Sequence, residues 1–109
     1  MRKITQCAID AFIEQHNFNS GNTKVVRIND GTNIKTELLL HNELIAYEIN
    51  GNTYISSQGW ETSTTRERLN GLLSELDGGR VYIRDFNMFY EDSQKITSPL
   101  QDKYFKEVR

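Results

Sequence analysis

The stretch TKVVRINDGTNIKTELLLHNELIAYEINGNTYISS, residues 23–57, decides the fold because its apolar residues alternate with polar ones. Such alternation is typical of β-strands, in which successive side chains point to opposite faces of a sheet. Four short segments are rich in β-branched and aromatic residues, which strands favour. We therefore expect strands at residues 23–29, 34–41, 43–49 and 52–57.

Turn-forming pairs separate these four segments. Asp30-Gly31 and Asn50-Gly51 suit the type I′ hairpin turn, in which both central residues have positive φ. His41-Asn42 is a weaker turn signal between the middle segments. Links this short require neighbouring strands to run antiparallel, so residues 23–57 predict a four-stranded meander.

Segment 43–49 carries apolar side chains on both of its faces: Ile45, Tyr47 and Ile49 on one, Leu44 and Ala46 on the other. A strand of this kind is usually covered on both sides. It is therefore expected to lie centrally, with protein packed against each face or within a strongly curved sheet.

Two amphipathic helices accompany the strands. Residues 3–16 show helical i, i+3, i+4 spacing of the apolar residues Ile4, Cys7, Ala8, Ala11 and Phe12. This pattern places Cys7 on the buried face, where its thiol would be inert. Leucines at the same spacing predict a second helix near residues 64–77, which Asp77-Gly78-Gly79 ends.

The remaining segments extend the sheet. Residues 80–92 predict two strands or one long bent strand, and residues 104–108 alternate as a closing edge strand would. The chain is then expected to be one α+β domain spanning residues 1–109. It would be an antiparallel β-meander of about five to seven strands, with an N-terminal helix and a second helix near residues 64–77.

Composition narrows the classes of function. The formal net charge is −2, and the 13 Lys and Arg residues form no basic block. Nucleic-acid binding usually leaves such a block, so this class is disfavoured. There is no apolar run of about 18 residues and no signal peptide, and the single Cys cannot form an intramolecular disulfide. We expect a cytoplasmic protein without a membrane partner.

Residues that could carry catalysis or bind a metal are few. Cys7, His16 and His41 are too dispersed for a zinc cluster, and no carboxylates fall in a recognised acid/base spacing. His41 lies at a turn, where a solvated side chain is the usual outcome, and Asp30 is read as a turn residue. We expect no enzyme activity, no metal and no cofactor.

The segment GWETSTTRERLNGLL, residues 59–73, stands out because it holds the sole Trp among hydroxyl and Arg residues. Thr64 and Glu67 have the spacing of a capping box, in which each side chain bonds the other's backbone amide. Trp60 would then pack at the edge of the core. On this interpretation the segment is a helix start and nothing more.

Several residues exceed what a helix start requires. Hydroxyls, arginines and free amides at a helix N-terminus can bind an anion, and an indole beside them can stack on a base. The candidate binding residues are Trp60, Thr62, Thr64, Thr65, Arg66, Arg68 and Asn70. The sequence leaves both interpretations open.

The order of residues from 38 to 73 resembles that of a group of small tailed-bacteriophage proteins. Their pattern GW-x-T-x-T-T-[KR]-x-R-L-N matches residues 59–70, and the match extends to His41, Ile45 and Ala46. The resemblance implies a phage accessory protein made in the host cytoplasm. By analogy with such proteins, it would bind and block host or defence machinery.

Two function hypotheses follow. The first is a small non-enzymatic protein whose partner is a host or phage protein. The alternative is a nucleic-acid or nucleotide-binding module that uses the segment of Trp60, the threonines and the arginines. A homodimer is also compatible with an apolar strand edge or a two-faced sheet.

Overall fold

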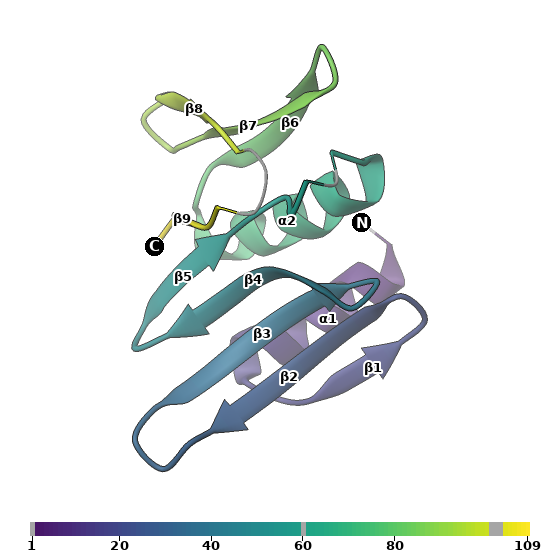
Figure 1. Ribbon diagram of the computed structural model, residues 1–109, viewed down its shortest axis with the longest axis vertical. Coiled ribbons are helices and arrows are strands. Elements are labelled where there is room, and N and C mark those ends of the chain that lie inside the picture. Colours follow the sequence, from purple (N-terminus) through teal and green to yellow (C-terminus); the bar gives the residue numbers. More distant parts are fainter. Residues whose placement is uncertain (1, 60, 101–103) are drawn as a thin grey trace.

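The computed structural model describes residues 2–59, 61–100 and 104–109 (Figure 1). These residues form two helices, α1 (Lys3–Glu14) and α2 (Ser63–Leu76), and nine strands in two antiparallel sheets. The α+β fold, the N-terminal helix and the second helix are confirmed. The described strands outnumber the five to seven that the sequence suggested.

A six-stranded sheet contains the predicted meander. Its order is β1-β2-β3-β4-β5-β9, with bounds Phe18–Ser20, Thr23–Asn29, Ile34–Leu40, Glu43–Ile49, Asn52–Ile55 and Lys106–Glu107. Strands β2 to β5 match the four expected segments closely, and β9 is the expected closing strand. Strand β1 was not expected, because its sequence FNS is short and rich in turn-forming residues.

One hairpin turn, at Asp30-Gly31, is not of the predicted type. Asn50 and Gly51 both have positive φ, as a type I′ turn requires, and so do His41 and Asn42. The type I′ prediction for Asp30-Gly31 was wrong, because four residues join Asn29 to Ile34 there. The Asp30 carboxylate accepts the amides of Thr32 and Asn33 at 2.9 and 2.7 Å, which closes the longer loop.

The expectation that residues 80–92 extend the first sheet was wrong, because a separate three-stranded sheet follows α2. Its strands are β6 (Arg80–Arg84), β7 (Asn87–Glu91) and β8 (Thr97–Pro99), so residues 80–92 form two strands. Gly79 leads into β6 with φ +95°, and a Cβ there would lie 2.1 Å from the Glu91 carbonyl oxygen. Glycine is therefore the residue that allows β6 and β7 to approach each other directly after the helix.

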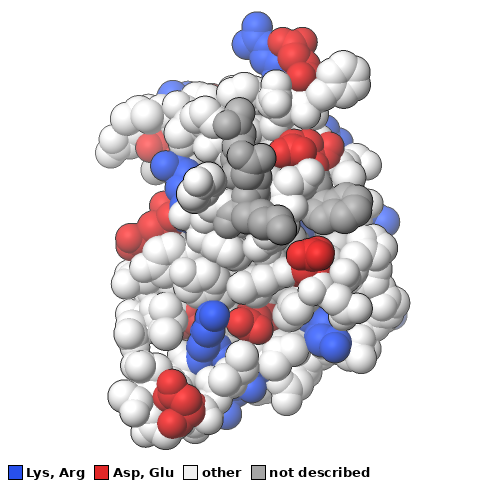
Figure 2. Space-filling model, viewed as in Figure 1, with Lys and Arg blue, Asp and Glu red and all other residues white. Residues whose placement is uncertain are grey.

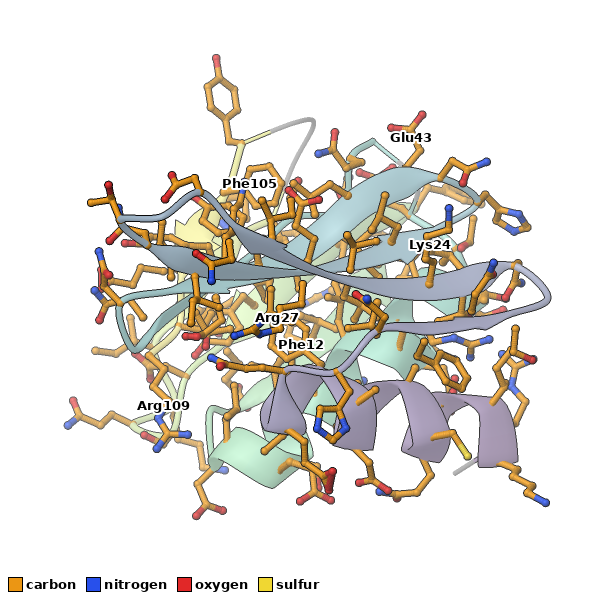
Figure 3. The ribbon with its side chains drawn as sticks, turned by 90° about the horizontal axis from the view of Figure 1, so that it is seen from below. Phe12, Lys24, Arg27, Glu43, Phe105 and Arg109 are labelled. Atoms are coloured by element: carbon orange, nitrogen blue, oxygen red, sulfur yellow. The ribbon has the colours of Figure 1, made fainter. Side chains whose placement is uncertain are left out.

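Both helices pack on the same face of the six-stranded sheet (Figure 3). The core between them is formed by buried side chains of α1, the inner sheet face and α2: Ala8, Ile9, Phe12, Val25, Leu38, Ile55, Leu69, Leu72 and Leu73. Strand β4 was expected to lie centrally, with protein packed on each face or within a strongly curved sheet, and it does lie between β3 and β5. In the described parts of the chain, helices cover one face of its sheet and leave the other, the outer face, open.

The apolar face of α1 is rotated from its predicted position. Cys7 is exposed, so the expectation of a buried thiol was wrong. The buried residues of the helix are Thr5, Ala8, Ile9, Ala11 and Phe12. Thr5 takes a buried position because its hydroxyl has polar partners on α2, which a hydropathy pattern does not reveal.

Candidate functional site

The candidate binding residues between 60 and 70 differ in their burial. Trp60 lies outside the described residues. Thr62 and Arg66 are exposed, whereas Thr65 and Arg68 are buried. The segment therefore presents only part of its hydroxyl and guanidinium groups to solvent.

Thr62 starts helix α2. Its hydroxyl oxygen accepts the Thr65 amide at 3.2 Å, and the two hydroxyls lie 3.0 Å apart. The capping box predicted at Thr64 and Glu67 was wrong by two residues, because Thr62 and Thr65 have the same spacing and occupy the cap. Because Glu67 does not cap α2, its carboxylate contacts α1 and the N-cap residue of α1, Arg2, instead.

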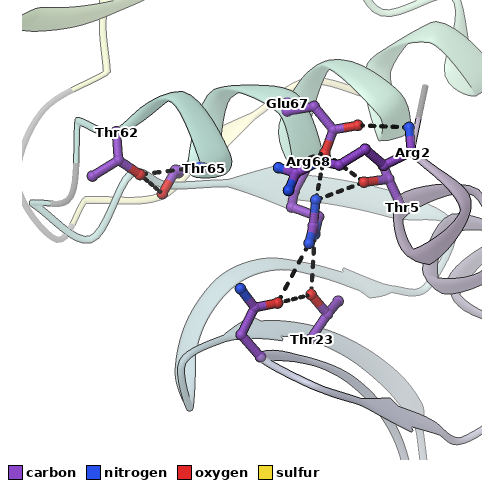
Figure 4. A network of polar contacts seen from close by, with 8 residues as sticks. Arg2, Thr5, Thr23, Thr62, Thr65, Glu67 and Arg68 are labelled. Atoms are coloured by element: carbon purple, nitrogen blue, oxygen red, sulfur yellow. Dashed lines mark hydrogen bonds and ion pairs between the residues drawn. The ribbon is translucent and has the colours of Figure 1, made fainter.

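Arg68 is a buried junction between three elements (Figure 4). The residue is 1% exposed, and its Nε donates to Thr23 Oγ1 on β2 at 3.0 Å. Its Nη1 donates to Thr5 Oγ1 on α1 at 2.6 Å and is also hydrogen-bonded to Glu67. Its Nη2 lies 3.4 Å from Asn22 Oδ1. A buried guanidinium needs such partners, so Arg68 holds the fold together and does not face a ligand.

Glu67 completes this junction between α2 and α1. Its carboxylate accepts from the Thr5 hydroxyl and from the Arg2 amide at 3.4 Å, and lies 3.6 Å from Arg2 Nη2. Burial alone would raise the pKa of this carboxyl. The hydrogen bonds from Thr5, Arg2 and Arg68, with the Arg68 charge, outweigh burial and hold the pKa of Glu67 below its ordinary value.

Asn70 has a structural partner as well. Its side-chain amide accepts the Val81 backbone N–H at 2.7 Å and donates to the Val81 carbonyl at 3.0 Å. These two bonds fasten α2 to strand β6. They explain why a mediocre helix former occupies the middle of the helix.

A pocket of about 230 Å³ opens beside the start of α2. Its described lining comes from the β3–β4 hairpin and the helix start: Leu40, His41, Glu43, Ile45, Thr62 and Thr64. Of the candidate residues, Thr62 and Thr64 therefore share a pocket, and Arg66 and Asn70 do not line it. His41 was read as a solvated turn residue, and only the folded hairpin brings it beside the threonines.

The outer face of the six-stranded sheet carries a group of apolar side chains. Register and alternation place on it Val26, Ile28, Leu39, Leu44, Tyr47, Tyr54 and Phe105. Ile28 is 41% exposed, and the others are half-buried. Figure 2 looks onto this face and shows uncharged atoms with charged groups between them, and the same register places Lys24, Lys35 and Glu37 there.

Aromatic rings form one end of the outer face. The Tyr47 and Tyr54 rings stack with centroids 4.8 Å apart, and Phe105 meets Tyr47 edge-on at 5.0 Å. Lys35 Nζ lies 4.6 Å from the Tyr47 ring centroid and 3.0 Å from the Glu37 carboxylate. Its charge is thus already engaged within the protein. Apolar residues on both faces of segment 43–49 were the sequence signal for this surface. Their predicted grouping was wrong, because the register shifts between Leu38 and Leu39, so that Leu44 joins Tyr47 on the outer face and Ile45 is buried with Ala46.

The described residues lack two kinds of feature. They contain no group of three or more His, Cys, Asp or Glu side chains placed to hold a metal ion. Neither described helix combines the length and apolar character needed to span a bilayer.

A comparison with protein families gives a match to the Kyanoviridae Gp96 protein family over residues 1–107. The match covers nearly the whole chain, so the chain belongs to this phage protein family, and the resemblance to phage proteins is confirmed. No curated protein and no solved structure matches the chain significantly.

Proposed function

From its membership of a phage protein family, we propose that this chain is a small accessory protein that acts by binding another protein. The partner is a protein of the host cell or of the phage, and the interaction takes place in the host cytoplasm. Binding to such a partner inhibits host or defence machinery. The chain acts by occupying its partner and performs no catalysis.

The observation that supports this proposal is the apolar outer face. Monomeric proteins rarely leave a large contiguous apolar patch open to water, and such patches commonly mark protein interfaces. The apolar residues of the outer face come from four neighbouring strands, β2 to β5, and from Phe105 before β9, so they extend across most of the sheet.

The chemistry of the face favours a protein over a nucleic acid. Lys35 is paired with Glu37, one further lysine, Lys24, lies on this face, and the Tyr47 and Tyr54 rings stack on each other instead of standing free for bases. Phosphate recognition requires unpaired cations, and the whole chain carries a net charge of −2. A complementary partner surface is therefore apolar with few charges.

The alternative hypothesis, binding of a nucleotide or nucleic acid, relied on residues that are partly buried. Arg68 and Thr65 are buried, and Arg68 is hydrogen-bonded within the protein. Arg66 is the exposed arginine of that segment. A single cation beside hydroxyls is a weak basis for binding phosphate.

The proposal can be tested with two isoleucines that are similarly exposed on opposite sides of the molecule. Ile28 lies on the outer face, 41% exposed, and Ile13 lies on α1, 47% exposed. The tagged wild type, Ile28→Lys and Ile13→Lys are each used to capture proteins from a lysate of infected host cells. A lysine at residue 28 should abolish capture of the partner, and a lysine at residue 13 should leave capture unchanged.

Two outcomes would contradict the proposal. Equal capture by all three proteins would show that the outer face is not the interface. Loss of wild-type capture after nuclease treatment would show that a nucleic acid, not a protein, forms the contact. Circular dichroism of each variant confirms that the fold is retained.

A further inference from the structure

The turn between β6 and β7 carries an aromatic side chain where a type I′ turn normally has glycine or asparagine. Asp85 and Phe86 are its two central residues, with φ of 52° and 66°, and Arg84 pairs with Asn87 across it. Left-handed backbone is costly for a bulky residue. In the two other described hairpin turns with positive φ at both central residues, the second position is Asn42 or Gly51, as expected.

The strained residue is also almost fully exposed. The Phe86 side chain is 93% exposed, the highest value among the exposed large hydrophobic residues of the described chain. Figures 1 and 2 show the turn projecting beyond the rest of the molecule. A phenylalanine here is unfavourable both for the backbone and for solvation, and at 93% exposure it packs little against the described rest of the chain.

Local strain at an exposed position is often retained for function. We propose that Phe86 is an anchor residue, and that its ring inserts into an apolar pocket of the protein partner. This inference rests on the proposed function and adds a second contact site, since the turn belongs to the three-stranded sheet and not to the outer face. Aromatic anchors that fill a pocket commonly dominate the affinity of an interface.

The charges beside the ring favour a protein pocket over other acceptors. Arg84 and Asp85 precede Phe86 directly and carry opposite charges, so the tip has no net charge. A wedge that enters nucleic acid or an anionic membrane is normally flanked by uncompensated cations. A protein pocket requires no such excess.

The test compares Phe86→Gly with a matched variant, Lys95→Gly. Lys95 is exposed with φ of 69° in the β7–β8 loop, so glycine relieves the same backbone strain there without touching the tip. Both variants should raise Tm by about 2–6 °C. The partner protein captured from infected-cell lysate is purified, and its Kd is measured for each variant.

Phe86→Gly should bind this partner at least about 10-fold more weakly, because truncating an anchor residue commonly has this effect. Lys95→Gly should bind as the wild type does, and Phe86→Tyr should retain most of the affinity. The combination of higher stability with weaker binding is what distinguishes an anchor from a structural residue.

Equal affinity of Phe86→Gly and the wild type would overturn the anchor role and leave the proposed function intact. A lower Tm for Phe86→Gly would show that the ring supports the fold, which also contradicts the inference. So would Phe86-dependent binding of the pure protein to phosphatidylglycerol vesicles or to a labelled single-stranded oligonucleotide. If the wild type captures no protein, the proposed function itself fails.

Discussion

The side-chain amide of Asn70 pairs with the backbone of Val81 as a neighbouring β-strand would. It accepts the Val81 N–H at 2.7 Å and donates to the Val81 carbonyl at 3.0 Å. Because Val81 lies in β6, the pair occupies part of the edge of the three-stranded sheet and links that sheet to helix α2. A helix side chain thus satisfies backbone groups that an edge strand would otherwise leave open.

Replacing Asn70 with Ala should lower the free energy of unfolding by about 1–3 kcal/mol, because two backbone groups of Val81 lose their partner. Urea denaturation followed by circular dichroism measures the change. Asn52→Ala, at an exposed Asn in β5, is the control and should change stability by less than about 0.5 kcal/mol. Equal effects of the two substitutions would contradict the structural role of Asn70.

Arg68 and Arg66 should behave very differently although they are two residues apart. Arg68→Met removes a buried guanidinium that Thr5, Thr23 and Glu67 contact, and should destabilise the protein by about 3 kcal/mol. Arg66→Met changes an exposed side chain and should be nearly neutral. Thermal unfolding of both variants provides the comparison. Similar Tm values would show that the buried network contributes little.

Glu67 should make stability depend on pH in the acid range. Its pKa is lowered in the folded state, so its contribution is complete above the ordinary value of 4.5 and is lost as the pH falls through the folded-state pKa. The free energy of unfolding should therefore fall below about pH 4.5, and Glu67→Gln should reduce this dependence. Asp30, whose pKa is also lowered, by the amides of Asn33 and Thr32, should leave a residual slope in the variant.

Urea titrations at pH values from 3 to 7 would measure this dependence for the wild type and for Glu67→Gln. An unchanged slope in the variant would mean that the Glu67 carboxylate has no special stabilisation in the folded protein.

Thr36 and Thr23, both buried threonines of the inner sheet face, should respond oppositely to replacement by Val. The Thr36 hydroxyl has no hydrogen-bond partner among the described residues, so Thr36→Val should stabilise the protein by about 1 kcal/mol. Thr23 accepts from Arg68 Nε and donates to Asn22, so Thr23→Val should destabilise it. Urea denaturation measures the change in the free energy of unfolding for each variant. A loss of stability in Thr36→Val would contradict the prediction.

The sequence by itself determined the parts of the fold that depend on local preference. Alternation in residues 23–57 specified strands β2 to β5, because a pleated strand exposes successive side chains to opposite sides. Helical spacing specified α1 and α2 nearly to their ends, and Asp77-Gly78-Gly79 ended α2 as expected. The phage resemblance likewise rested on the order of residues alone.

Tertiary structure decided the roles of the polar side chains. Whether Arg68 contacts a ligand or the core depends on Thr5 and Thr23, which are 63 and 45 residues away in the chain. The same holds for Asn70, whose partner lies on another element, and for Cys7, whose exposure follows from the rotation that buries Thr5. Local pattern carries no information about such distant partners, because hydrogen bonds between elements form only when packing brings the elements together.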